Sequence, residues 1–330
     1  MGKAYFDGPF APLCELFVAQ KRAAGLQYEQ QAMLLRMFDN FCKGYDIQNH
    51  TITEEIALAW FCLRPNEKEI TRHGRVGEMQ RFSVFLTKQG YPSYLLSGLP
   101  KKGELHTSYI FSKEEIGRIF QRLDSLERTN LAPIRHFVFP LLVRVLYGCG
   151  LRISEVLALL KSDVDTERGI LHIRHGKNDR ERIVPMAESL TAACRCYVSE
   201  VHAATAPDTP FFYTKAQTAY EQSTITKQFK GFLWDVGIPY RGKHFGPRVH
   251  DLRHTFICHN IQRWAEQGIP IQHMLPILSK YVGHTSISAT QWYLRLTPEI
   301  YPHLRDICER ELSGMYAGIA QFTVGGADDE

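Results

Sequence analysis

The stretch from residue 97 to residue 115, SGLPKKGELHTSYIFSKEE, constrains the fold more than any other part of the sequence. It holds two glycines, a proline and paired lysines, and its apolar residues follow no regular period. Such a composition is typical of an interdomain linker. Because 330 residues are comfortable for two domains, we expect a helical domain over residues 1–100, a linker over 101–111 and a second domain over 112–330.

The first domain contains four segments whose apolar residues recur at helical spacing, at residues 11–26, 28–45, 51–63 and 75–91. The first ends at Gly25 and the fourth at Gly90, and glycine is typical of helix C-termini. In the third, Thr51 stands three residues before Glu54, which predicts a capping box. We therefore expect a small bundle of short helices.

The second domain is expected to be mostly helical as well, and Ser112 with Glu115 predicts a capping box at the start of its first helix. One segment differs: GILHIRHGKNDRERIVPM, residues 169–186, has β-branched runs on both sides of a polar turn and predicts a β-hairpin. The predicted fold class is therefore mainly α with a small β-hairpin or sheet, in two domains, the second of them α+β.

Composition limits the classes of partner. A hydrophobic content of 44% and a charged content of 22% are ordinary for a soluble globular protein. The net charge is only +4, so a polyanion would have to be bound by a local basic patch. The eight cysteines are scattered without a CxxC pair, and the sequence has neither a signal-peptide pattern nor an 18-residue apolar run. We expect a cytoplasmic protein with no membrane partner.

Two segments of the second domain each carry a candidate phosphate-binding residue. In YGCGLRISEVLALL, residues 147–160, two glycines precede Arg152, which opens a helix with Glu155 one turn on. This arginine adds its guanidinium to the free N–H groups of the helix N-terminus; alternatively, it is a surface arginine paired with Glu155. Lys177 lies in the hairpin turn, where it can donate a proton or a point charge, although charged turns are commonplace.

A third candidate segment is HDLRHTFICH, residues 250–259. His250 and Arg253 stand at i and i+3 and so share a helix face, with His254 beside them. The segment lacks the H-E-x-x-H spacing of a zinc helix, and an arginine between the histidines would repel a divalent cation. We therefore expect no metal at this site.

The fourth segment is YVGHTSISATQWYLRLTPE, residues 281–299. His284 follows a glycine, and Thr285 or Ser286 is a suitable N-cap for a short helix that carries Tyr293. Taken alone, a tyrosine beside a tryptophan is more often a packing residue than a reactive one. Together, however, the four segments supply two arginines, two histidines, a lysine and a tyrosine without an acidic metal-binding cluster. That set suits phosphoryl transfer without a cation.

These motifs, in this order, resemble those of the tyrosine recombinase (phage integrase) family. GLRISE, the hairpin lysine, the H-x-x-R box HDLRH and the G-H…Y box VGHTSISATQWY all stand where that family has them. YVGH departs from the leucine-rich form usual in the family. The resemblance covers residues 110–310 as a catalytic domain, and the helical region before it resembles the core-binding, SAM-like DNA-binding domain of the family.

The resemblance implies a role for each motif residue. Tyr293 would attack the scissile phosphate, form a 3′-phosphotyrosyl link and free a 5′-hydroxyl. Arg152 and Arg253 would hold the non-bridging oxygens. Lys177 would be the general acid toward the 5′-oxygen, with His250 assisting proton transfer.

The resemblance further implies that His284 donates a hydrogen bond to the same phosphate and that Glu155 orients its neighbours. Neither ATP, nor a metal, nor another cofactor would be required. The implied partners are double-stranded DNA and three further copies of the chain, in a tetramer on two paired sites, with residues 306–322 as a docking segment. The implied activity is site-specific recombination, as in the integrase or transposase of a mobile element.

Three other interpretations stay open: a type IB topoisomerase-like nicking-closing enzyme, a non-catalytic DNA-binding regulator on the same scaffold, and a histidine-dependent metallohydrolase. The separate helical domain favours recombination over the first, and the complete set of reactive residues argues against the second. Outside the site, a basic cluster near the domain junction offers DNA-binding candidates, although it could equally be solvated surface charge. Its members are Arg72, Arg75, Arg81, Lys101 and Lys102.

Overall fold

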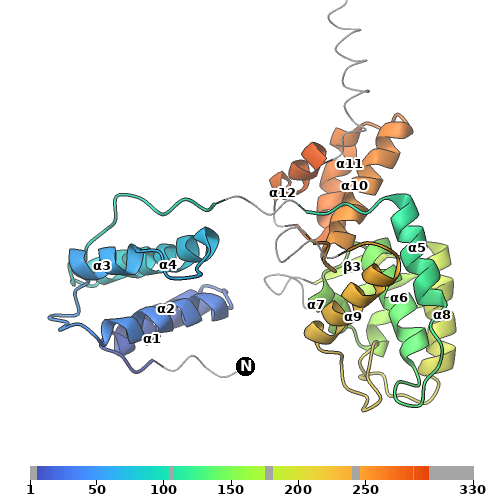
Figure 1. Cartoon of the computed structure of the whole chain (residues 1–330), viewed down its shortest axis with the longest axis horizontal. Helices are drawn as coiled ribbons and strands as arrows, with labels where there is room; N and C mark the ends of the chain where they lie inside the picture. The colour runs from blue at the N-terminus through green and yellow to red at the C-terminus, as the bar shows by residue number, and fades with distance from the viewer. Residues whose placement is uncertain (1–5, 104–107, 175–180, 240–245, 285, 297–330) are drawn as a thin grey trace, which may run out of the picture. The chain divides into compact units, whose positions relative to one another are not determined.

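The computed structural model describes residues 6–103, 108–174, 181–239, 246–284 and 286–296. The chain divides into two compact units, Met1–His106 and Thr107–Glu330. Figure 1 traces both units.

Residues 6–103 of the first unit form four helices, as predicted: α1 (Ala11–Ala23), α2 (Glu29–Cys42), α3 (Glu54–Phe61) and α4 (Glu69–Lys88). Its core is rich in aromatic rings, including Phe10, Phe17, Phe38, Trp60 and Phe82. The rings of Phe38 and Trp60 meet edge to face with centroids 5.1 Å apart, a geometry that aromatic pairs prefer. Four short helices therefore share one apolar interior.

Two boundary predictions in this unit are wrong. The N-cap of α3 is Thr53, whose hydroxyl accepts from the Ile56 N–H at 3.4 Å, whereas the Thr51 hydroxyl donates to Asn49. A hydroxyl directly before the helix reaches its free N–H groups better than one two residues earlier. Helix α4 begins at Glu69 rather than at residue 75. The prediction missed its first turns because they are polar and show no apolar period.

The structure contradicts the DNA-contact prediction for Arg75. This side chain is 1% exposed and donates to Glu67 at 2.6 Å, to the Cys62 carbonyl at 2.6 Å and to the Trp60 carbonyl. The hydrogen bonds from Arg75 hold the pKa of Glu67 below its ordinary value despite partial burial. Arg75 therefore ties α4 to the segment after α3, and because its charge is already paired with the Glu67 carboxylate, it is not available to a phosphate.

The other members of the basic cluster differ in exposure. Arg72 is half-buried, and its Nε donates to the Phe61 carbonyl at 2.7 Å. Arg81 is 53% exposed and pairs with the buried Glu78. Lys101 and Lys102 are exposed. The two lysines are thus the members best able to meet a polyanion.

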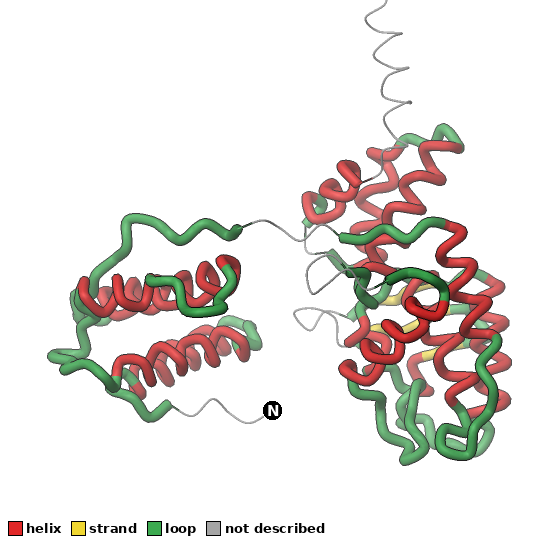
Figure 2. Tube along the Cα trace, viewed as in Figure 1, coloured by secondary structure: helices red, strands yellow, loops and turns green. Residues whose placement is uncertain are grey.

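The second unit is built from helices around a small sheet (Figure 2). Its long helices are α5 (Lys113–Asp124), α6 (Arg135–Gly148), α8 (Glu188–Val201), α9 (Gln222–Asp235), α10 (Asp251–Glu266) and α11 (Ile271–Val282). Its short helices are α7 (Ile153–Leu157), α12 (Ser288–Gln291), and the 3₁₀ turns η1 (Lys161–Asp163) and η2 (Trp292–Leu296).

The predicted hairpin is confirmed and gains a third strand. Strands β1 (Val164–Asp165), β2 (Ile170–Ile173) and β3 (Arg182–Pro185) form an antiparallel sheet in that order. Val164 pairs with Leu171, which in turn pairs with Val184. These aligned apolar residues bury one face of the sheet, as the alternating pattern of β2 predicts.

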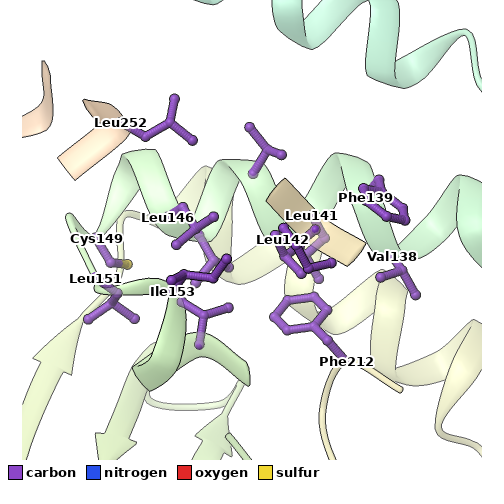
Figure 3. Close-up of a cluster of buried hydrophobic side chains, with 14 of the residues drawn as sticks. Val138, Phe139, Leu141, Leu142, Leu146, Cys149, Leu151, Ile153, Phe212 and Leu252 are labelled. Carbon is purple, nitrogen blue, oxygen red and sulfur yellow. The ribbon is translucent and has the colours of Figure 1, made fainter. Parts of the chain in front are cut away.

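Helix α6 forms the centre of this unit and packs against α5, α8 and α10. Its buried side chains, among them Val138, Leu142 and Leu146, fill the core in Figure 3, together with Leu252 of α10. The capping box of Ser112 and Glu115 at the start of α5 is confirmed. This core holds the start of α10 close to the end of α6.

The segment predicted as linker is partly folded. Phe111 is fully buried, and its backbone N–H donates to the Thr255 hydroxyl at 3.0 Å. Its large ring packs into the core of the second unit, so the chain is fixed before α5 begins. Among the described residues, none of the helices has the length and apolarity needed to cross a membrane.

Replacing Arg75 tests its structural role. We expect Arg75→Gln to reduce the stability of the first unit by about 3–5 kcal/mol, because removing one partner leaves Glu67 enclosed without its counter-charge. Hydrogen exchange of the α3 and α4 amides during urea titration measures this. The control is Arg36→Gln, an exposed arginine on α2, which should leave the exchange unchanged.

Candidate active site

The turn between α6 and α7 positions the first site residue. Gly150 has φ +58°, and a Cβ there would lie 2.3 Å from the Phe256 ring, so only glycine fits. The turn places Arg152 at the N-cap of α7. It also aims the Gly150 carbonyl at the Arg253 guanidinium, 2.8 Å away.

Glu155, one turn into α7, links two arginines. It is 2% exposed and accepts from the Arg152 backbone at 2.9 Å and from the Arg152 guanidinium at 2.7 Å. Arg182, the first residue of β3, donates two further bonds at 3.0 and 2.9 Å. Burial by itself raises the pKa of Glu155, but the hydrogen bonds and charges of the arginines outweigh it, so that the pKa lies below its ordinary value.

The start of α10 carries the predicted H-x-x-R residues. Arg253 is 2% exposed and donates to the carbonyls of Gly150 at 2.8 Å and Val282 at 2.6 Å. Burial and the nearby charge of Arg152 lower its pKa to about 9, so it is still a cation at neutral pH. His250, the N-cap of α10, has an edge open to solvent. Its packed surroundings and the charges of Arg253 and Arg152 lower its pKa to about 4.

His284 follows the end of α11, where Gly283 has φ +69° and its carbonyl accepts from Arg152 at 3.1 Å. The His284 Nδ1 lies 2.7 Å from the Thr290 hydroxyl, which leaves Nε2 for a ligand. Burial and the charges of Arg253 and Arg152 lower the pKa of His284 to about 4. Helix α12 has Ile287 as its N-cap, so the expected Ser286 cap is wrong, and Thr285 lies outside the described residues.

Tyr293 lies in η2 and is 4% exposed, packed among the apolar residues of α10 and α11. Its hydroxyl is 2.6 Å from the Nδ1 of His254, and its ring stacks on that of His284 with centroids 6.1 Å apart. Burial raises the pKa of Tyr293 to about 12, although the charge of Arg253 opposes the shift. The phenol therefore holds its proton at neutral pH.

The second unit thus brings together residues that are far apart in the sequence: Arg152, Glu155, His250, Arg253, His284 and Tyr293. Lys177 lies outside the described residues, but β3, which follows the hairpin turn, is anchored to the site through Arg182. Across the described part of the chain, no three His, Cys, Asp or Glu side chains are grouped so that they could hold a metal ion.

Comparison with known proteins places this site in a family. Residues 110–299 match the model of the phage integrase family. The chain is also 30% identical over 301 residues to y4rB, a predicted integrase/recombinase of Sinorhizobium fredii, covering 88% of this chain and 94% of that one. The chain belongs to the phage integrase family.

Named recombinases and integrases are similar to this chain over part of its length. The tyrosine recombinase XerA of Pyrococcus furiosus is 30% identical over 188 residues, 56% of this chain and 57% of that one. Among solved structures, XerH recombinase bound to palindromic difH DNA has a TM-score of 0.64 at 20% identity, covering 84% of this chain and 79% of that one. The Tn1549 transposon integrase bound to transposon right-end DNA has a TM-score of 0.61 at 15% identity, covering 85% and 94%. These structural likenesses confirm the predicted fold class.

Sequence reasoning did not assign two residues that contact the site. Arg182 lies on the same face of β3 as the buried Val184. An arginine on the apolar face of a strand could have indicated a buried charged partner from the sequence alone. His254 stands beside Arg253 in the sequence, but no local pattern predicts its contact with Tyr293. Contacts between distant segments are set by packing, which local spacing does not encode.

The buried carboxylate gives a pH-dependent prediction. We expect Glu155→Gln to lower the stability at neutral pH by about 3–5 kcal/mol, because an amide offers one acceptor oxygen instead of two and carries no charge, so the charges of both arginines stay uncompensated. Since the folded pKa lies below the ordinary 4.5, the contribution is complete above that pH and disappears as the pH falls through the folded value. Thermal denaturation between pH 7 and pH 3 should show that the difference in stability between wild type and Glu155→Gln becomes smaller below about pH 4.5. Glu167→Gln, at an exposed site, should show no such difference; a gap of constant size would contradict the linkage.

Proposed function

We propose that this member of the phage integrase family is a site-specific DNA recombinase that cuts and rejoins strands through a 3′-phosphotyrosyl link on Tyr293. One observation carries the proposal: the imidazoles of His254 and His284 contact the phenol of Tyr293, and the charges of two guanidiniums, those of Arg152 and Arg253, act on it. Fixed hydrogen-bond donors and cations of this kind stabilise a phosphate as its charge increases in the transition state.

Arg152 and Arg253 are proposed to hold the non-bridging oxygens. Their contacts with the carbonyls of Gly150, Val282 and Gly283 fix both guanidiniums and use only some of their N–H donors. The remaining donors suit an oxyanion, and His284 adds a hydrogen bond from Nε2. Glu155 orients Arg152 and takes no part in the reaction.

The chemical step is an exchange of one phosphodiester for another. The Tyr293 oxygen attacks phosphorus, and the 5′-oxygen leaves with a proton from Lys177, assisted by His250. Because the bond energy is retained in the tyrosyl ester, neither ATP nor a metal is required. A 5′-hydroxyl from a second strand then reverses the step and exchanges strands.

The proposed partner is double-stranded DNA, with four copies of the chain on two paired sites. We further propose that residues 1–100 form the core-binding domain, 101–111 the linker and 112–330 the catalytic domain. Similarity to a predicted integrase/recombinase over nearly its whole length supports a role in integration or transposition of a mobile element.

Removing the phenol oxygen tests the nucleophile. Purified protein is incubated with a random-sequence duplex library carrying nicks, and covalent adducts that survive SDS are recovered and sequenced. We expect Tyr293→Phe to yield no adduct while keeping DNA binding, because only the attacking atom is removed. The control is Tyr281→Phe, in which the missing hydroxyl pairs with the Pro185 carbonyl and the Cys149 thiol rather than with a residue of the proposed site; it should still form the adduct.

The same assay separates the alternatives. Adducts undiminished in Tyr293→Phe would overturn the assignment of the nucleophile. Strand cleavage that leaves no adduct and is lost in excess EDTA would indicate a metallohydrolase, and cleavage that persists in EDTA would exclude one. Relaxation of supercoils without joining of two sites would indicate a nicking-closing enzyme, and binding without any adduct would indicate a regulator.

Charge substitutions near the end of the first unit test the DNA surface. We expect Lys101→Gln with Lys102→Gln to weaken binding and to reduce the slope of log affinity against log salt by about 0.9 for each phosphate that the variant no longer neutralises. Fluorescence anisotropy with the recovered duplex measures the slope. Lys88→Gln, at the exposed end of α4, is the matched control. An unchanged slope in the double variant would remove these lysines from the DNA surface.

A further inference from the structure

The proposed function does not yet assign an acceptor for the proton of the Tyr293 hydroxyl. A phenol buried to 4% exposure with its pKa raised to about 12 carries its hydrogen at neutral pH. Attack on phosphorus requires that this hydrogen leave the oxygen as the new bond forms. Lys177 and His250 are assigned to the 5′-oxygen on the other side of the phosphate, so the proton on Tyr293 needs an acceptor of its own.

The hydroxyl of Tyr293 lies 2.6 Å from the Nδ1 of His254. This distance is within the range for direct proton transfer between a general base and its substrate. The two rings are 5.4 Å apart at an angle of 36°, and the ring of His250 meets that of His254 edge-on at 4.7 Å. His254 is half-buried on α10, one residue after Arg253.

Other polar groups of the site are committed elsewhere. Arg152 and Arg253 are cations and accept no proton. The Nδ1 of His284 is bound to Thr290, and its ring lies parallel to that of Tyr293. The buried carboxylate of Asp251 accepts from the backbone N–H of Arg248. The geometry therefore singles out the imidazole of His254.

We propose that His254 is a catalytic residue, the general base that takes the proton of Tyr293 during cleavage and returns it during rejoining. In cleavage, the O–H bond of Tyr293 breaks and its proton passes to Nδ1, while its oxygen bonds to phosphorus and the bond from phosphorus to the 5′-oxygen breaks. In rejoining, the imidazolium gives the proton back as the tyrosyl oxygen leaves. An imidazole suits both directions because it exchanges protons near neutral pH.

This inference rests on the proposed function, so its test uses the duplex recovered in the adduct assay. Three variants test the role of His254. His254→Asn places an amide oxygen near the position of Nδ1, so it can still accept a hydrogen bond but cannot take a proton. His254→Ala removes both functions. His259→Asn is the matched control, because the Nδ1 of His259 on the same helix also pairs with a tyrosine hydroxyl, that of Tyr147, at 2.9 Å.

We expect both His254 variants to form the adduct at least about 10²-fold more slowly, the usual contribution of a general base, and His259→Asn to be unchanged. A second duplex carries sulfur in place of the bridging 5′-oxygen. Because a thiolate leaves without protonation, this duplex should restore cleavage by Lys177→Ala but not by His254→Asn. Added imidazole should partly restore cleavage by His254→Ala.

The outcomes are distinct. Absence of an adduct with wild type overturns the proposed function and this inference with it. An adduct with wild type and an equal rate with His254→Asn overturns only the role as a base. Rescue of His254→Asn by the sulfur duplex would assign the residue to the leaving group and overturn it as well. If His254→Ala fails to fold, the nearly isosteric His254→Asn, checked by its melting temperature, still decides.

Discussion

The site depends on one buried carboxylate. Glu155 pairs with Arg152 and Arg182 at once, and without its negative charge the two guanidiniums would repel each other more strongly in a poorly hydrated interior. Because Arg152 opens α7 and Arg182 opens β3, the same contact fixes a helix to the sheet. A network that stabilises the fold thereby also positions Arg152, the proposed phosphate-binding group, although Glu155 itself has no chemical role in the proposed reaction.

Two left-handed glycines extend this network. Gly150 and Gly283 expose carbonyls at tight turns, and Arg253 and Arg152 bind them across the site. A side chain at either turn would meet Phe256 or Arg182 and move a guanidinium. The backbone therefore holds the arginines in place without a ligand, which is the preorganisation that the proposed electrostatic catalysis would require.

Much of this was predictable from the sequence, because its signals are local. Helical spacing, the capping box at Ser112, the β-branched hairpin and the order of the motifs depend on neighbouring residues. The errors arose where burial decides. From the sequence alone Arg75 has the pattern of a surface charge, and only the structure shows its pairing with Glu67. The contacts of Arg182 with Glu155 and of His254 with Tyr293 join residues 27 and 39 positions apart. No local period encodes such pairs.

Tyr293, the proposed attacking residue, lies in a short 3₁₀ turn that follows a four-residue helix. Helix α12 has four residues, too few to form a stable helix alone, and it leads directly into the turn that carries Tyr293. Its attachment relies on side-chain bonds such as that between His284 and Thr290. Local opening of this short piece costs far less than unfolding the packed helices beneath it. In the proposed reaction, the phenol of Tyr293 could therefore be withdrawn or delivered while the cluster of Arg152, Glu155 and Arg253 stays assembled.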